Sequence, residues 1–158
     1  MKRGRVRSAS SPAFFWASLA LLGGACQTVD LGTPPADVNA CRPSQSFFVT
    51  DVWPKVLVKD YGGKHCFDAT CHDVASGKSL ALIADPKPAL DPTMPIPMPL
   101  PADWARNYVS ATEQMSCTNV TSSDLIVFPT ATRSHGGNKL FDVNSPETMT
   151  LEMWVTAP

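Results

Sequence analysis

The segment that decides the fold is KHCFDATCH, residues 64–72. It contains two cysteines, Cys66 and Cys71, separated by four residues, and His72 follows the second cysteine directly. Thiols and imidazoles are the side chains that most often attach or ligate a cofactor. The chemistry of the protein is therefore expected to centre on this segment.

The pattern C-x4-C-H is a widened form of C-x-x-C-H, the attachment motif of c-type haem. In that motif both thiols form thioethers with the porphyrin, and the adjacent histidine coordinates the iron. The adjacency of Cys71 and His72 is the strict requirement, whereas the loop before it tolerates extra residues. The sequence predicts covalent haem c at Cys66 and Cys71, with His72 as proximal ligand. A local Cys66–Cys71 disulfide, or a metal site that adds His65, stays open.

Apolar periodicity predicts helices on both sides of this segment. The first covers residues 46–60 and bends or restarts at Pro54, because proline disrupts a helix interior. A second covers residues 102–116, and a third begins at Pro146 with Ser145 as its cap. Residues 122–130 are short enough for a strand-like segment or a single turn. The faces expected to be buried are Trp104, Tyr108, Ala111 and Met115 in the second helix, and Leu151, Trp154 and Val155 in the third; Met149 and Met153 are expected to pack as well.

Residues 85–101 contain seven prolines in 17 positions. No helix tolerates that density, so an extended, polyproline-like strap over the core is expected. Its apolar edge is predicted to consist of Met94, Ile96, Met98 and Leu100.

Residues 1–25 have the three parts of a secretory signal: basic MKRGRVR, the apolar run AFFWASLALL, and small residues before Cys26. The apolar run is shorter than the roughly 20 residues that span a bilayer. The cysteine at the cleavage point resembles a bacterial lipobox, which implies acylation of Cys26 and membrane anchoring. A soluble secreted protein with Cys26 in a disulfide stays the alternative. Residues 27–40 are then a tether, and residues 41–158 form one domain.

Charge and motif content exclude several classes of function. The chain has 13 basic and 14 acidic residues; residues 1–25 hold four of the basic ones, which leaves nine against 14 and a net charge of −5. That balance argues against nucleic acid, whose phosphates need a basic surface. Neither a nucleophile–base constellation nor a phosphate-binding loop is evident, so we expect no enzyme.

The cysteine segment and its surroundings resemble the c-type cytochrome domains of exported bacterial lipoproteins, in which C-x4-C-H recurs. The similarity includes Phe47-Phe48 and residues 52–57 upstream, and residues 123–125, 135–137 and 151–155 downstream. The resemblance implies a mainly α fold: a small cytochrome c-like helical domain with a Pro-rich strap and long loops. It also implies a membrane-anchored electron carrier of the cell envelope, facing the periplasm or in the outer membrane, with redox proteins as partners.

The remaining cysteines are expected to pair. Exported thiols rarely stay free, and Cys66 and Cys71 are better used together, so a Cys41–Cys117 disulfide is predicted. The competing function is a haem-free lipoprotein stabilised by disulfides, with a binding or structural role.

The sixth iron ligand is a choice between His135 and Met98. In the domains that this chain resembles, the distal ligand comes from the loop before the terminal helix, here residues 129–144. That loop contains His135, flanked by Gly136-Gly137. His135 is therefore the predicted distal ligand and Met98 the second choice, and an exposed loop histidine without a ligand role stays open.

Overall fold

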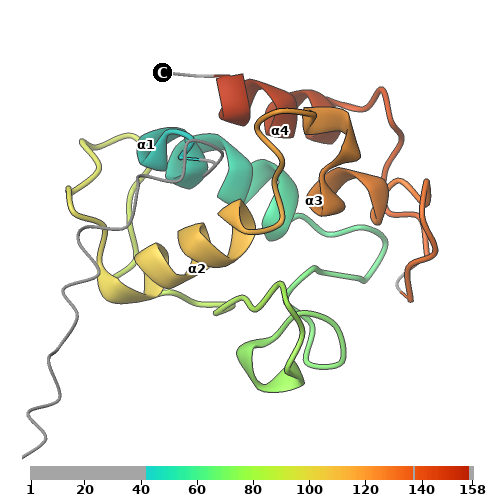
Figure 1. Ribbon diagram of the computed structural model, residues 1–158. Helices are drawn as coiled ribbons and strands as arrows, with labels where there is room; N and C mark the ends of the chain where they lie inside the picture. Colours follow the sequence, from blue (N-terminus) through green and yellow to red (C-terminus); the bar gives the residue numbers. More distant parts are fainter. Residues whose placement is uncertain (1–41, 137, 157–158) are drawn as a thin grey trace, which may run out of the picture. The chain divides into compact units, whose positions relative to one another are not determined.

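Helices make up most of the regular structure in the computed structural model, which describes residues 42–136 and 138–156 (Figure 1). Within these residues the β structure is one isolated parallel bridge between Asp73 and Leu82. The prediction of a mainly α fold is confirmed. The described residues all belong to one unit of the chain, Pro35–Pro158. The expected signal peptide, Cys26, the tether and Cys41 lie outside the described residues.

The first predicted helix is continuous across Pro54. It starts as α1 (Gln45–Phe47) and continues as η1 (Phe48–Leu57), a π-helix that contains the proline. Ser44 begins it, because its hydroxyl accepts a hydrogen bond from the Phe47 amide at 3.3 Å. The predicted restart at Pro54 is wrong, because the helix continues through the proline. The wider π turn relieves the clash between a proline ring and the preceding turn.

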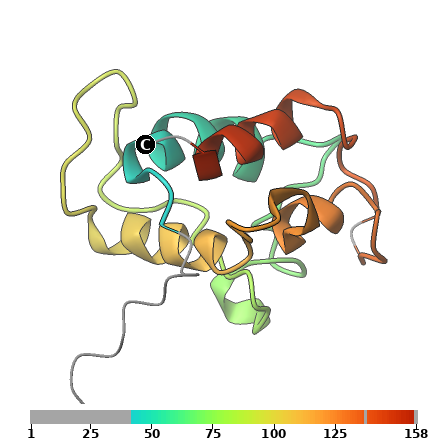
Figure 2. The same cartoon turned by 45° about the horizontal axis from the view of Figure 1, so that its top comes forward.

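The core lies where η1, α4 (Pro146–Thr156) and α2 (Ala102–Thr112) meet (Figures 1 and 2). Phe48 is fully buried, and its ring lies 5.4 Å from Trp154 and 5.7 Å from Tyr108, measured between centroids. Trp154 donates from Nε1 to the Ser44 carbonyl at 2.9 Å, and Tyr108 donates from its hydroxyl to the Pro43 carbonyl at 2.6 Å. The polar tips of these rings thereby fix the start of the first helix on the other two.

Helix α2 ends four residues before the predicted position 116. The chain continues in tighter turns, in which the amides of Gln114 and Met115 donate to carbonyls three residues back. The predicted face is nevertheless correct, since Trp104, Ala111 and Met115 are buried and Tyr108 is half-buried.

The segment between α2 and α4 contains the short helices η3 (Val120–Ser122) and α3 (Asp124–Val127), so a single turn replaces the strand-like alternative. Helix α4 begins as predicted at Pro146, and the Thr148 amide donates to the Ser145 hydroxyl. Leu151 and Trp154 are fully buried. The expectation that Met149 and Met153 pack is wrong: each is about half exposed, because they lie on the opposite face of the same helix.

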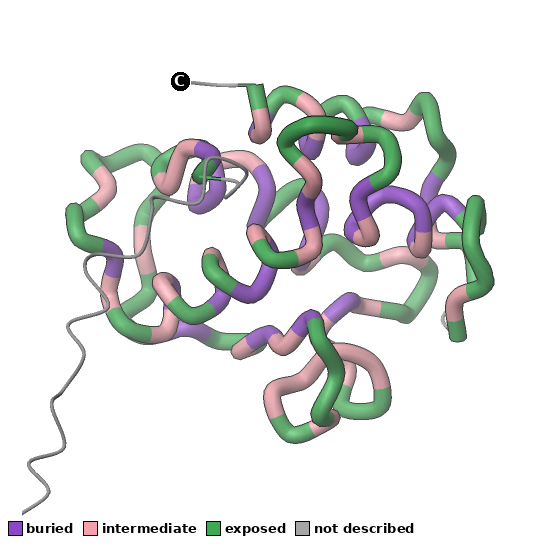
Figure 3. The backbone as a smooth tube through the Cα atoms, in the orientation of Figure 1, coloured by how far each residue is buried: buried purple, intermediate pink, exposed green. Residues whose placement is uncertain are grey.

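The Pro-rich segment forms no regular element and is mostly exposed (Figure 3), and its first residues lie beside α2. The Lys87 amide donates to the Asp103 carboxylate at 2.9 Å, and Trp104 donates from Nε1 to the Pro88 carbonyl at 2.8 Å. The predicted apolar edge is only partly correct. Leu100 is buried and Ile96 packs against the core, but Met94 and Met98 are 61% and 55% exposed.

Candidate functional site

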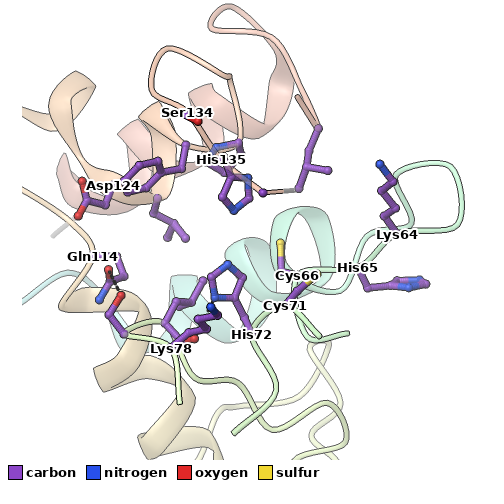
Figure 4. Close-up of a pocket in the computed structure, with 17 residues that line it drawn as sticks. Lys64, His65, Cys66, Cys71, His72, Lys78, Gln114, Asp124, Ser134 and His135 are labelled. Carbon is purple, nitrogen blue, oxygen red and sulfur yellow. Dashed lines mark hydrogen bonds between the residues drawn. The ribbon is translucent and has the colours of Figure 1, made fainter. Parts of the chain in front are cut away.

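Four of the predicted site residues line one cavity of about 230 Å³ (Figure 4). Cys66, Cys71 and His72 come from the cysteine segment, and His135 comes from the loop between α3 and α4. These residues are far apart in the sequence, and the helical core brings the two segments together. Met98 is not among the lining residues.

The two extra residues of the C-x4-C-H motif lie in two consecutive turns of the chain between Cys66 and Cys71. The Asp68 amide donates to the His65 carbonyl, and the Cys71 amide donates to the Asp68 carbonyl at 2.7 Å. The Asp68 carboxylate also accepts from the His65 amide at 2.8 Å. The loop then closes on itself, since the His72 amide donates to the Cys66 carbonyl at 3.0 Å. The wider spacing therefore still brings Cys66, Cys71 and His72 to one wall.

His72 has one ring nitrogen occupied and one available. Its Nδ1 lies 3.0 Å from the Leu80 carbonyl oxygen, which can only accept, so Nδ1 carries the proton. Burial lowers the pKa of His72, and the neighbouring His135 and Lys78 lower it further, against the Leu80 hydrogen bond, which raises it. The neutral ring thus keeps a lone pair on Nε2, as metal-ligating histidines do when a carbonyl orients them.

The two thiols differ in their surroundings. Cys66 is 7% exposed and Cys71 is half-buried, and neither is in a disulfide. Burial raises the pKa of the Cys66 thiol to about 12, and the nearby charges of Cys71 and Asp68 raise it too. Two separate thiols on one wall are the state from which thioethers are formed.

His135 faces His72 across the cavity (Figure 4). Their ring centroids are 6.0 Å apart and their planes differ by 12°. Metal–imidazole bonds are about 2.0 Å long, as for zinc, and a ring nitrogen lies roughly 1.1 Å from the ring centre, so two imidazoles on opposite sides of one metal have centroids about 6 Å apart. This spacing would allow both imidazoles to bind one iron.

The Nδ1 atom of His135 is buried and has no hydrogen-bond partner. A buried polar atom of this kind costs free energy, and sites that receive a ligand tolerate such atoms. Its ring also lies 5.9 Å from the Phe128 ring, measured between centroids.

The walls between the two histidines suit a flat apolar group. The lining contains five large apolar side chains, and the polar side chains of Lys64, Gln114 and Asp124 lie toward the edges of the view (Figure 4). The apolar lining is Leu80, Leu125, Phe128, Pro129 and Leu140, and the polar lining includes Lys64, Lys78, Gln114 and Asp124. Two thiols, two facing imidazoles and apolar walls together fit haem c.

The third histidine, His65, points away from the facing pair (Figure 4). It stacks on Phe67 with centroids 4.9 Å apart, and its Nδ1 lies 3.4 Å from the Asp68 carboxylate. The alternative metal site would need His65 and His72 to point toward one ion, but the two side chains point in different directions. Within the described ranges, no three His, Cys, Asp or Glu side chains gather as metal ligands.

Of the two cysteines in the predicted Cys41–Cys117 disulfide, the structure describes only Cys117. Cys117 is not a free thiol, but Cys41 lies outside the described residues, so the pairing stays a prediction. The same holds for acylation of Cys26. Over residues 42–136 and 138–156, no helix has the length and apolarity needed to cross a bilayer.

Comparison with known proteins adds no relative: no family model, curated protein or solved structure matches the chain. The assignment of the site therefore depends on its own geometry.

Sequence reasoning missed the Leu80 carbonyl, which bonds to the His72 ring. It also missed Ser110 and the fully buried Asn107 on α2, which bond to the Ala81 and Ile83 amides. A signal was present, since the polar residues Asn107 and Ser110 lie at helical spacing beside Trp104 and Ala111 of the predicted buried face.

Proposed function

We propose that this protein is a c-type haem protein that transfers electrons in the bacterial cell envelope. Haem would be attached through Cys66 and Cys71, with His72 and His135 as axial ligands. The observation that carries this proposal is the facing pair of imidazoles, 6.0 Å apart between centroids, in a cavity that also contains both motif thiols.

Each residue has a defined role in this proposal. Cys66 and Cys71 hold the porphyrin edge, and the Leu80 carbonyl keeps Nε2 of His72 free for the iron. His135 would supply a second nitrogen ligand to the iron, and the apolar side chains of the lining would contact the porphyrin. The haem iron supplies one-electron chemistry when bound, and ligand identity and burial set its potential. We propose no catalytic residue.

The competing function, a haem-free scaffold with a local disulfide, gains no support from the site. Cys66 and Cys71 are separate thiols in the structure, and the cavity beside them has apolar walls. The proposal also includes three expectations that come from the sequence alone. These are membrane anchoring through Cys26, a redox protein as partner, and no binding of nucleic acid.

The test is a pyridine haemochrome spectrum of the full chain matured in a host with cytochrome c maturation machinery. We expect a spectrum of thioether-linked haem and a haem-stained band on a denaturing gel. Cys71→Ser should abolish most of the stain, and Cys66→Ser should retain a single thioether. A wild-type chain without covalent haem in that host would defeat the proposal and favour the scaffold.

A further inference from the structure

The segment that holds His72 is itself ordered by side chains of α2. Residues 79–83 form no strand and bend at Ser79 and Leu80, and alternate residues bond to polar side chains of α2 and of the turn that follows it. The Ile83 backbone pairs with Asn107 twice: its amide donates to Oδ1 at 2.8 Å, and its carbonyl accepts from Nδ2 at 3.0 Å. The Ala81 amide donates to the Ser110 hydroxyl at 2.7 Å, and the Ser79 hydroxyl donates to Gln114 at 3.4 Å.

The spacing of the bonded groups on the segment is similar to their spacing on α2. Ala81 and Ile83 are two residues apart, at most about 6.6 Å of extended chain, and Asn107 and Ser110 are three residues apart in the helix, about 4.5 Å. The side chains of Asn107 and Ser110 thus bond to backbone groups that a neighbouring strand would otherwise satisfy; within the described chain, the segment has only the Asp73–Leu82 bridge as β pairing. Leu80 and Leu82 alternate with the bonded residues and are buried in the core.

One peptide group connects these side chains of α2 to the iron ligand. The Leu80 carbonyl and the Ala81 amide belong to the same rigid, planar peptide unit, and in a trans peptide they point in opposite directions. On one side the amide donates to Ser110, and on the other side the carbonyl accepts from Nδ1 of His72. Leu82 adds a second restraint, since its amide donates to the His72 carbonyl at 2.7 Å.

We propose that Ser110, supported by Asn107, is a positioning residue for His72: it fixes the Leu80–Ala81 peptide plane and thereby the ring tautomer and direction. Ser110 is 8% exposed and Asn107 fully buried, so water does not replace these bonds readily. The proposal rests on the proposed function for its purpose, namely to keep Nε2 of His72 directed at the iron. The contact itself exists without haem.

The test is therefore made first on the full chain expressed without haem-maturation machinery. Long-range proton–nitrogen NMR at a pH above the pKa of His72 should show the Nδ1–H tautomer in the wild type. In Ser110→Ala the Nε2–H tautomer should rise about two- to tenfold, the effect of one lost hydrogen bond. Ser110→Thr, which keeps the hydroxyl, should restore the wild-type ratio. The matched control is Thr112→Ala, because the Thr112 hydroxyl donates within the helix to the Tyr108 carbonyl.

A wild-type tautomer ratio in folded Ser110→Ala would overturn the proposal. Should that variant fail to fold, amide exchange in the wild type decides: fast exchange of Ala81, like that of the exposed Ala89, would overturn it, and strong protection would support it. In matured protein, Ser110→Ala should also broaden the low-spin electron paramagnetic resonance signal. Absence of haem in the wild type would defeat the proposed function and leave the tautomer result intact.

Discussion

The two walls of the cavity are held in different ways. On the His72 wall, the ring bonds to the Leu80 carbonyl, and the segment behind it bonds to Ser110 and Asn107. On the opposite wall, His135 lies in a loop, and its buried Nδ1 has no partner. That loop also contains two non-glycine residues with positive φ, Ala131 at 57° and Asn138 at 62°.

This difference between the two walls indicates which of the two histidines is held in position before a cofactor binds. A ligand that is restrained before the cofactor arrives loses little entropy on binding, whereas a loop ligand must be ordered by the bond it forms. Under the proposed function, the His72 wall would determine where the haem lies, and His135 would complete the coordination.

The largest expected effect separates the two histidines. His72→Ala should remove most covalent haem, because the motif histidine is the restrained ligand next to Cys71. His135→Ala should keep the haem but convert its spectrum from low-spin to high-spin, since one axial position is lost. Haem staining and the absorption spectrum measure both. His65→Ala is the matched control: His65 lines the same cavity but stacks on Phe67, so this variant should resemble the wild type.

An unchanged low-spin spectrum in His135→Ala would refute its role as distal ligand. A methionine–iron charge-transfer band that disappears in Met98→Ala would then assign the sixth position to Met98. Because Met98 is 55% exposed and outside the cavity lining, such a result would require the strap to move.

The second prediction concerns how well the folded His72 wall protects the Cys66 thiol from a reagent in solution. In haem-free protein at pH 8, iodoacetamide should modify Cys66 more slowly than Cys71, by on the order of tenfold or more, because the thiolate is the reactive form. Burial raises the pKa of Cys66 to about 12, so its thiolate is scarce, and the rate should increase as the pH rises toward that value. Mass spectrometry of peptides after timed quenching gives both rates.

Urea provides the control for that experiment, since unfolding should make the two rates similar. Equal rates in the folded protein would mean that the wall opens readily, and the contrast between the two walls would then be lost.

The elements of this site were not equally predictable from the sequence. Local signals in the sequence predicted the main parts of the site. Adjacent cysteine and histidine residues marked the cysteine segment, neighbouring glycines marked His135, and caps and apolar periodicity marked the three main helices. The continuity of η1 through Pro54 was not predictable, because apolar periodicity does not distinguish a π turn around a proline from a break in the helix. The exposure of Met98 was missed because composition does not tell which side of a strap meets the core.

The contacts that orient His72 were missed for a different reason. Ser110 and Asn107 bond to backbone groups more than twenty positions away, and a backbone amide or carbonyl has no signature in the sequence. Polar residues on a core-facing helix stripe were the available hint.

The third prediction concerns an ion pair between the chain segment that leads into the His72 wall and the helix that follows the His135 loop. Lys59 follows η1, ahead of the cysteine segment, and bonds to Glu147 at the start of α4, after the His135 loop. Burial raises the pKa of Glu147, but hydrogen bonds from Lys59 and Ser145 and the charge of Lys59 lower it more, so the net pKa is below the usual value of 4.5. This stabilisation is complete above pH 4.5 and is lost as the pH falls through the lowered pKa.

Glu147→Gln should therefore reduce the free energy of unfolding at pH 7 by about 1 kcal/mol, since Lys59 is half exposed and the pair is partly screened. Urea titrations at pH 7 and pH 3 measure the effect, and the difference between variant and wild type should shrink at pH 3. Asp51→Asn is the control, because its partner Lys55 lies on the same helix and does not connect the walls. A constant difference across this pH range would contradict the assignment.

The smallest effect tests the strain in the His135 wall. Ala131 has φ of 57°, a left-handed conformation that disfavours a side chain with Cβ, and its amide donates to the Phe128 carbonyl at 3.0 Å just after α3. Glycine adopts this conformation freely, so Ala131→Gly should stabilise the protein by about 0.5–1 kcal/mol. The matched substitution in the other wall is Ala81→Gly, where φ is not positive and glycine adds only chain entropy to the unfolded state. That variant should lose stability by a similar amount. Urea unfolding of both variants gives the sign directly. If Ala131→Gly is destabilising, the loop around His135 is not strained, and the two walls differ only in how their histidines are bonded.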